Sequence, residues 1–188
     1  MAFEFEYTKL PGVMIIKPQV FGDSRGYFME TYRIEPFAEA GITAEFVQDN
    51  ESSSTKGVLR GLHFQKEHTQ GKLVRVTKGS VFDVAVDVRP GSATFGQWTG
   101  VVLSEENKQM IYVPEGFAHG FLVLSDEARF VYKCTDVYDP KSEGGIPWND
   151  PDIAVEWPEL DCGYKTSPKD GMHPAFRGQR FDWAEKYI

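Results

Sequence analysis

Apolar and polar residues alternate in short runs through the first three quarters of the chain, and this pattern predicts strands. A run with an apolar residue at every second position, as in residues 128–135, gives a strand one apolar face. Turn-forming residues such as Lys78-Gly79-Ser80 separate the runs. Nine strands are predicted, at residues 13–17, 26–33, 58–65, 72–78, 80–89, 96–103, 109–113, 118–124 and 128–135. Many short strands at this spacing indicate an all-β sandwich or barrel.

Outside the strands, the pattern predicts one short helix and a long irregular segment. Residues 35–40 suit a helix, because Pro36 falls in its first turn and Gly41 ends it. After about Tyr138, five of the eleven prolines fall within thirty residues, at positions 140, 147, 151, 158 and 168. We expect an irregular C-terminal arm draped over the barrel, with a short helix near residues 181–187. No repeat or linker divides the chain, so a single domain spanning residues 1–188 is expected.

Composition places the chain among globular proteins. Of its 188 residues, 41% are hydrophobic and 14% aromatic, which is enough to bury a sizeable core. No apolar run is long enough to cross a bilayer, and the N-terminus lacks the basic start and apolar run of a signal peptide. The chain has only two cysteines, Cys134 and Cys162. These features together predict a cytoplasmic protein.

The charge balance narrows the range of partners. With 20 basic and 28 acidic residues, the net charge is −8, which repels nucleic acids and anionic membranes. We therefore expect neither nucleic acid nor membrane as a partner. A small phosphorylated ligand stays open, because a few arginines can dominate the potential inside a pocket.

Two of the predicted strands carry polar residues that packing alone does not require. Residues 57–65 hold Arg60, His63 and Gln65 beside two glycines, and residues 114–121 hold His119 among apolar residues. We interpret these stretches as opposite walls of one pocket.

The spacing of these histidines resembles the metal motif of cupins, G-x5-H-x-H followed by P-x-G-x2-H. Gly57 and His63 fit the first part, and Pro114, Gly116 and His119 fit the second. However, Gln65 replaces the second histidine, and Thr69 and Gln70 stand where a carboxylate ligand would follow. Because a catalytic metal usually needs about three protein ligands, we expect a cupin-like barrel without a catalytic metal. Lys72 is then the candidate for stabilising negative charge in the pocket.

Longer motifs resemble one family over about residues 18–170. They are Asp23-Ser24-Arg25-Gly26-Tyr27-Phe28, Val47-Gln48-Asp49-Asn50, residues 57–65, Gly71-Lys72-Leu73-Val74-Arg75, Asp83-Val84-Ala85-Val86-Asp87, Thr94-Phe95-Gly96, residues 114–121, Tyr132-Lys133, Trp148-Asn149-Asp150-Pro151 and Ser167-Pro168-Lys169-Asp170. They look like the dTDP-4-dehydrorhamnose 3,5-epimerase family. This resemblance implies a double-stranded β-helix, also called a jelly roll, and a homodimer without a cofactor. It also implies epimerisation of dTDP-4-dehydro-6-deoxy-D-glucose to dTDP-4-dehydro-L-rhamnose through an enolate, in dTDP-L-rhamnose biosynthesis.

The resemblance assigns four catalytic residues. His63 would be the base, since an imidazole with a pKa of about 6.5 can abstract protons near neutrality. Asp170 would orient and support His63. Tyr132 would be the acid on the other side of the sugar ring, and Lys72 would stabilise the enolate oxygen.

The resemblance also assigns the substrate-binding residues. They are Arg25, Glu30, Gln48, Asp49, Asn50, Arg60, His119, Tyr138, Glu143 and Lys169. Arginine suits the diphosphate because its planar fork donates paired hydrogen bonds, and Tyr138 would stack on thymine. In the family the N-terminal region crosses to the partner subunit, so Arg25 and Glu30 are expected to serve the neighbour's site. The chain departs from the family pattern at Thr166 and Pro168, next to Asp170.

One assignment conflicts with strict alternation. Arg60 and His63 differ by an odd number of residues, which places them on opposite faces of a regular strand. Both can face the pocket only if the strand is irregular, and we predict a bulge at Gly61.

Three alternatives stay open at this stage. The nearest is an epimerase that acts at C3 or C5 alone, or a ketoisomerase. The second is a metal-dependent cupin oxygenase, and the third is a sugar-binding cupin without activity.

Overall fold

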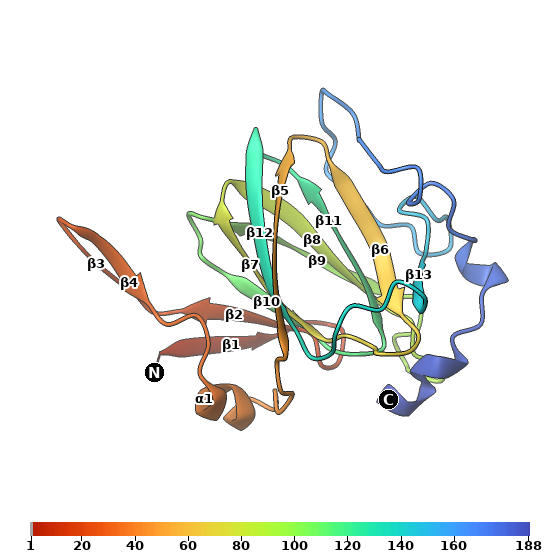
Figure 1. Cartoon of the computed structure of the whole chain (residues 1–188), viewed down its shortest axis with the longest axis horizontal. Coiled ribbons are helices and arrows are strands. Elements are labelled where there is room, and N and C mark those ends of the chain that lie inside the picture. The colour runs from red at the N-terminus through yellow and green to blue at the C-terminus, as the bar shows by residue number, and fades with distance from the viewer. Residues whose placement is uncertain (1) are drawn as a thin grey trace.

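Two antiparallel sheets, stacked face to face, form the body of the computed structural model, which describes residues 2–188 (Figure 1). The first sheet contains, in spatial order, β1 (Phe3–Tyr7), β2 (Met14–Pro18), β10 (Met110–Val113), β7 (Lys72–Lys78), β12 (Glu127–Cys134) and β5 (Gln48–Thr55). The second contains β13 (Glu143–Gly145), β6 (Leu59–Gln65), β11 (Phe117–Val123), β8 (Ser80–Asp87) and β9 (Trp98–Ser104). The all-β, cupin-like jelly roll predicted from the sequence is confirmed.

Alternation along the strands divides the apolar residues between two sides of each sheet. Val74 and Val76 of β7 belong to the core between the sheets, together with Phe121 and Phe130. Leu73 points the other way, into a separate cluster that also contains Phe37. Phe37 lies on helix α1 (Ile34–Glu39), so the predicted helix is present and covers the outer face of the first sheet.

The C-terminal segment covers the outer face of the second sheet, as Figure 1 shows in blue. Leu62 and Phe64 of β6 pack there against Ile146, Trp157 and Phe181. Beyond β13 the only regular elements in the described chain are two 3-10 helices, η1 (Phe176–Gly178) and η2 (Asp182–Tyr187). The predicted irregular arm and terminal helix are therefore confirmed, and the arm brings residues 167–173 to the edge of β6.

The structure corrects the sequence prediction at both edges of the first sheet. Strand β5 was not predicted, because its sequence QDNESSST contains no apolar residue. Strand β1 was not predicted either. The strand predicted at residues 26–33 is one half of a hairpin, formed by β3 (Val20–Asp23) and β4 (Gly26–Met29), and it ends at Met29. No helix in residues 2–188 is long and apolar enough to span a membrane.

Candidate active site

Strand β6 is irregular at Gly61, and this irregularity sets the direction of two site residues. His63 pairs with His119 and Arg60 pairs with Phe121, so three residue steps on β6 match two on β11. Because His119 and Phe121 share a face of β11, Arg60 and His63 share a face of β6. Gly61 has φ of 123°, and a Cβ added there would lie 2.5 Å from the Cα of the neighbouring strand's glycine. The bulge predicted at Gly61 is confirmed.

Polar side chains enter the space between the sheets from both walls. His63 and His119 lie opposite each other on the second sheet. Lys72 shares one face of β7 with Val74, and Tyr132 shares one face of β12 with Phe130. Val74 and Phe130 belong to the core between the sheets, so Lys72 and Tyr132 lie on the inner faces. The ring of Phe130 connects the walls, at 6.1 Å from the ring of His119 and 5.7 Å from that of Tyr132. The histidines therefore face the lysine and the tyrosine across the interior.

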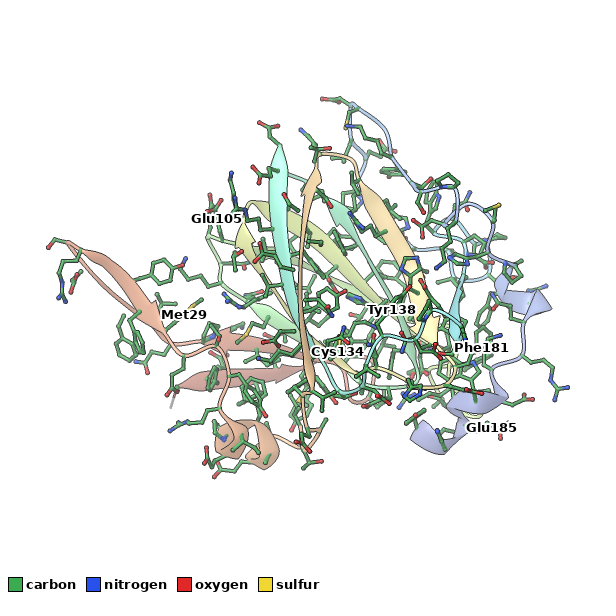
Figure 2. The ribbon with its side chains drawn as sticks, viewed as in Figure 1. Met29, Glu105, Cys134, Tyr138, Phe181 and Glu185 are labelled. Atoms are coloured by element: carbon green, nitrogen blue, oxygen red, sulfur yellow. The ribbon has the colours of Figure 1, made fainter. Side chains whose placement is uncertain are left out.

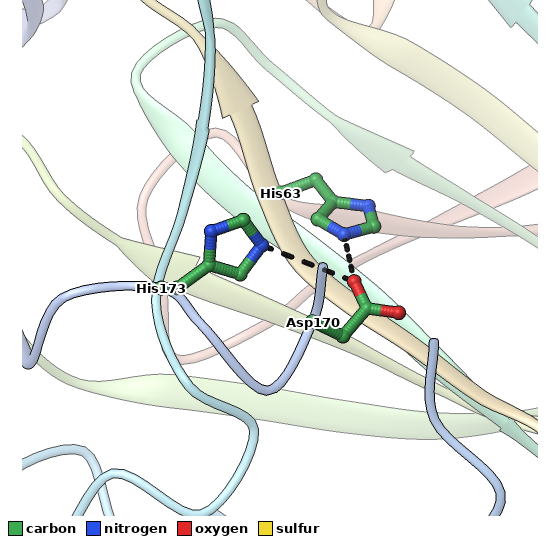
Figure 3. A group of neighbouring side chains, drawn as sticks. All are labelled: His63, Asp170 and His173. Atoms are coloured by element: carbon green, nitrogen blue, oxygen red, sulfur yellow. Dashed lines mark hydrogen bonds and ion pairs between the residues drawn. The ribbon is translucent and has the colours of Figure 1, made fainter. Parts of the chain in front are cut away.

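His63 forms a hydrogen-bonded pair with Asp170 (Figure 3). The contact joins His63 Nε2 to Asp170 Oδ1, and Asp170 Oδ2 accepts a 2.7 Å hydrogen bond from the Ser167 hydroxyl. Burial alone would raise the pKa of Asp170, but the hydrogen bonds from His63 and Ser167 outweigh it and lower the pKa to about 2. Asp170 is thus ionised near neutrality and accepts a hydrogen bond from the Nε2–H of His63. His63 keeps its lone pair on Nδ1, which is the nitrogen available as a base.

Lys72 and Tyr132 each carry a polar group that faces the interior without a partner in the described part of the chain. Within residues 2–188, neither the Lys72 ammonium nor the Tyr132 hydroxyl has a hydrogen-bond or ion-pair partner. Burial lowers the pKa of Lys72, and the acidic groups of Cys134, Asp83 and others oppose that shift. Burial likewise raises the pKa of Tyr132, so its hydroxyl keeps its proton. Both groups are therefore available to a ligand, one as a donor cation and one as an acid.

His119 is held by a buried carboxylate. Its Nε2 lies 2.9 Å from Asp83 Oδ1 and 3.0 Å from Asp83 Oδ2. His119 is 7% exposed and Asp83 is fully buried. The hydrogen bond fixes the orientation of the imidazole and leaves only Nδ1 for another partner.

A connected set of polar residues surrounds the pocket. Glu143 Oε2 lies 2.5 Å from the Lys169 ammonium and accepts a 2.8 Å hydrogen bond from the Tyr138 hydroxyl. Burial would raise the pKa of Glu143, but these two hydrogen bonds lower it on balance. The backbone N–H of Tyr138 donates to Gln48 Oε1 at 3.0 Å, and Gln48 Nε2 donates to Asn50 at 3.0 Å. The structure thus joins residues of β5, β13 and the C-terminal arm into one rim.

Arg60 completes this rim from β6. Its guanidinium donates a 3.1 Å hydrogen bond to Ser54 on β5 and stays exposed to solvent. It is also near enough to Tyr132 for its positive charge to oppose the rise in the pKa of that phenol. An exposed guanidinium beside the pocket can donate to an anionic group.

Comparisons with known proteins identify the family of this chain. A family model described as dTDP-4-dehydrorhamnose 3,5-epimerase matches residues 7–178. This chain belongs to that family. A dTDP-4-dehydrorhamnose 3,5-epimerase from Shigella flexneri is 60% identical over 183 residues, which is 96% of this chain and 97% of the relative.

Solved structures of epimerases share the fold over nearly the whole chain. The dTDP-6-deoxy-D-glucose-3,5-epimerase from Legionella pneumophila Philadelphia 1, in complex with dTDP-4-keto-L-rhamnose, matches with a TM-score of 0.93 and 50% identity over 96% of both chains. A 3'-monoepimerase from Streptomyces bikiniensis, in complex with dTDP-quinovose, matches with a TM-score of 0.84 and 32% identity over 96% of this chain and 89% of that one. Enzymes of this fold thus include both double and single epimerases.

Three residues expected to bind substrate lie outside this pocket. Asp49 is on the outer face of β5, where it contacts the Lys133 ammonium at 2.9 Å. Arg25 is at the tip of the β3–β4 hairpin, bound to Asp23, and Glu30 follows β4 beside Arg33, at 3.7 Å. The hairpin projects away from the sandwich, and Met29 lies far from Cys134 and Tyr138 in Figure 2. The structure brings together the other expected residues and leaves these three apart.

Sequence reasoning missed one residue that lies beside the His63–Asp170 pair, His173. Its Nε2 lies 3.9 Å from Asp170 Oδ1, and its ring meets that of His63 edge to face, with centroids 5.6 Å apart (Figure 3). Burial, and next the neighbouring His63, lower the pKa of His173, so the ring is neutral near pH 7. The motif that carries the family resemblance ends at Asp170, and nothing in the pattern after it indicates that His173 turns back toward His63.

Proposed function

We propose that this protein epimerises dTDP-4-dehydro-6-deoxy-D-glucose at C3 and C5 to give dTDP-4-dehydro-L-rhamnose, in dTDP-L-rhamnose biosynthesis. The observation that carries the proposal is the position of the His63–Asp170 pair on one wall, facing Lys72 and Tyr132 on the other. Inversion at a carbon next to a ketone needs a base on one face of the sugar and an acid on the opposite face. The pocket supplies both.

The first step is removal of a proton from the carbon next to the ketone. His63 Nδ1 accepts this proton, and the ionised Asp170 stabilises the imidazolium that forms. The electrons of the broken C–H bond move into the C4 carbonyl and give an enolate. Lys72 stabilises the enolate oxygen, since its ammonium is otherwise unpaired within residues 2–188.

The second step returns a proton to the opposite face. Tyr132 donates its phenolic proton to the carbon while the enolate collapses to the ketone, which leaves a tyrosinate and an imidazolium. Exchange with solvent then restores both groups, so each round is neutral overall. The raised pKa of Tyr132, caused by burial, keeps the phenol protonated before each round. One round at C3 and one at C5 complete the reaction, which is redox-neutral and needs no cofactor.

The rim residues would hold the nucleotide. Arg60 and Lys169 would contact the diphosphate, while Gln48 and Asn50 offer amides to the sugar or base. Tyr138, which is exposed, would stack on thymine. Glu143 would position Tyr138 and Lys169, and His119 would donate to the substrate from Nδ1.

We further propose a cytoplasmic homodimer in which Arg25 and Glu30 act on the partner's nucleotide. Both lie on a hairpin that reaches away from its own pocket, with Arg25 87% exposed. Cys134 and Cys162 are free thiols, which suits a reducing compartment. Asp49 would support Lys133 on the outer face of the sheet.

Proton NMR of the product formed in deuterium oxide tests the proposed reaction. We expect one deuterium at C3 and one at C5, because each inversion replaces a carbon-bound hydrogen by a solvent-derived one. Label at only one carbon would indicate a single epimerase such as the Streptomyces bikiniensis enzyme. His63→Ala should lower turnover by several orders of magnitude and nearly keep nucleotide binding. His68→Ala is the matched control, since His68 is an exposed histidine that also contacts an aspartate, Asp136.

A further inference from the structure

We propose that His63, Asp170 and His173 form a binding site for a first-row divalent cation such as Zn²⁺, and that this cation inhibits the enzyme. Cation binding follows from the three side chains alone. Inhibition rests, in addition, on the proposed role of His63 as the base.

The three side chains offer the donor set that zinc prefers. One nitrogen from each histidine and one oxygen of Asp170 all lie within 4.8 Å of one another. With bonds of about 2.0–2.2 Å, neighbouring ligands of a zinc ion stand roughly 3.4 Å apart. For all three atoms to bind one ion, the hydrogen-bonded contact between His63 and Asp170 must therefore lengthen, and His173 Nε2, now 3.9 Å from Asp170 Oδ1, must move closer. Two imidazoles and a carboxylate also leave one or more positions open to water.

The second observation is an unsatisfied nitrogen. The side chain of His173 is only 9% exposed, and its Nε2 has no hydrogen-bond partner in residues 2–188. That atom faces Asp170 (Figure 3). A buried polar atom without a partner destabilises the fold, and a bound cation would satisfy it. The ring also packs directly on Gly145, where an added Cβ would come within 2.5 Å of Nε2, so its position is restricted.

The surroundings support the ligands and admit an ion. Ser167 holds Asp170 Oδ2 at 2.7 Å, which leaves Oδ1 directed toward the two histidines. Outer hydrogen bonds of this kind orient the ligands of protein metal sites. His63 is 32% exposed, so an ion can enter from the pocket side.

Coordination would remove the base. In the free enzyme Nε2 of His63 carries the proton and Nδ1 carries the lone pair. A cation bound at Nε2 uses the lone pair of that nitrogen, and the imidazole proton moves to Nδ1. Nδ1 can then no longer accept a proton from the substrate. The cation and the proton transfer thus compete for one imidazole, without any net release of protons.

Zinc titration against a chromogenic chelator tests the site in the full-length protein. We expect one equivalent of Zn²⁺ to bind at pH 7, and His173→Gln to weaken its affinity at least tenfold. Co²⁺ gives a second readout, because its visible absorption reports nitrogen ligands and should change in His173→Gln. His68→Gln is the matched control and should bind like the wild type. Equal zinc affinity in His173→Gln and the wild type would overturn the proposal.

Activity measured with chelator and with added Zn²⁺ tests the inhibition. We expect zinc to inhibit the wild type and His68→Gln, and to inhibit His173→Gln only at concentrations at least tenfold higher. A protein that binds zinc but shows no epimerisation in chelator would disprove the proposed function and keep the cation site. Epimerisation in chelator that added zinc leaves unchanged would disprove the inhibitory site and keep the function. Thermal unfolding of each variant, with chelator present, shows whether the fold is kept.

Discussion

Arg60 and His63 share the inner face of β6 although they are three positions apart along the chain. The extra residue is accommodated at Gly61, opposite Gly120, where β6 and β11 approach too closely for any side chain. Without this bulge, either the proposed base, His63, or the proposed phosphate ligand, Arg60, would point into the apolar layer outside the second sheet. Strand β6 can therefore direct both side chains into the pocket only because residue 61 is a glycine.

Gly61→Ala should lower both stability and activity. Its φ of 123° is unfavourable for alanine, and the new Cβ would meet backbone atoms at 2.5 Å and 2.8 Å. We expect a loss of about 3 kcal/mol in the free energy of unfolding, measured in urea. Gly26→Ala is the control, because Gly26 has a similar φ of 135° with nothing within 4 Å. If both substitutions have the same effect, close approach to β11 is not the reason for Gly61.

The sequence predicted features that depend on neighbouring residues in one strand, and it missed features that depend on segments far apart in the chain. Alternation along one strand predicted the irregularity at Gly61, once the family resemblance had assigned both Arg60 and His63 to the pocket. Strand β5 was missed since its inward residues, Gln48 and Asn50, are polar and serve the pocket instead of the core. The approach of Asp170 to His63 joins residues 107 positions apart, so only the family resemblance indicated it. His173 follows from the path of the arm, which no periodicity encodes.

Asp170 should make the fold sensitive to acid. Its pKa is about 2 in the folded protein, against 3.8 as the ordinary value. A carboxyl group with a lowered pKa contributes stability that is complete above about pH 4 and is lost as the pH falls toward 2. This lowering of the Asp170 pKa corresponds to a contribution of about 2 kcal/mol to the free energy of unfolding.

Urea unfolding of the wild type and of Asp170→Asn at several values from pH 5 to pH 2 measures this contribution. We expect the difference in stability between the two proteins to shrink over the lower half of that range. Asp182→Asn is the control, since Asp182 is an exposed carboxylate that pairs with Arg180. A difference that stays constant down to pH 2 would contradict the assignment of the acid sensitivity to Asp170.

Tyr132→Phe should separate proton removal from proton return. His63, Asp170 and Lys72 are unchanged in this variant, so the carbon-bound proton can still leave. Without the phenol, protonation on the opposite face should fall by a factor of about 10² to 10⁴. In deuterium oxide, we expect exchange into recovered substrate to continue while epimerised product nearly disappears.

Tyr138→Phe is the control for Tyr132→Phe. It removes a hydroxyl that binds Glu143 on the rim, outside the space between the sheets. Its effect should fall mainly on KM, because Tyr138 is proposed to contact the nucleotide. If Tyr132→Phe loses both deuterium exchange into the substrate and epimerisation, Tyr132 has a role other than returning the proton.

Lys72→Met should stabilise the protein while it disables the enzyme. Burial lowers the pKa of Lys72, so the folded state disfavours the ammonium more than the unfolded chain does. Folding stability of the wild type should therefore rise as the pH increases through the lowered pKa toward 10.5, and Lys72→Met should lack this rise. Methionine fills the same space beside Val74 without a charge. Turnover should fall by about 10² to 10³, because the enolate oxygen loses its cation.

Lys78→Met provides the comparison at the other end of β7. Lys78 is exposed and binds Glu127 at 2.6 Å, an ion pair of the kind that adds little stability at a surface. Turnover of this variant should match that of the wild type. Urea unfolding from pH 7 to pH 10 and steady-state rates, measured on both variants, separate the two effects. If Lys72→Met is less stable than the wild type at pH 7, the Lys72 ammonium stabilises the fold. Burial of the ammonium would then not destabilise the folded state.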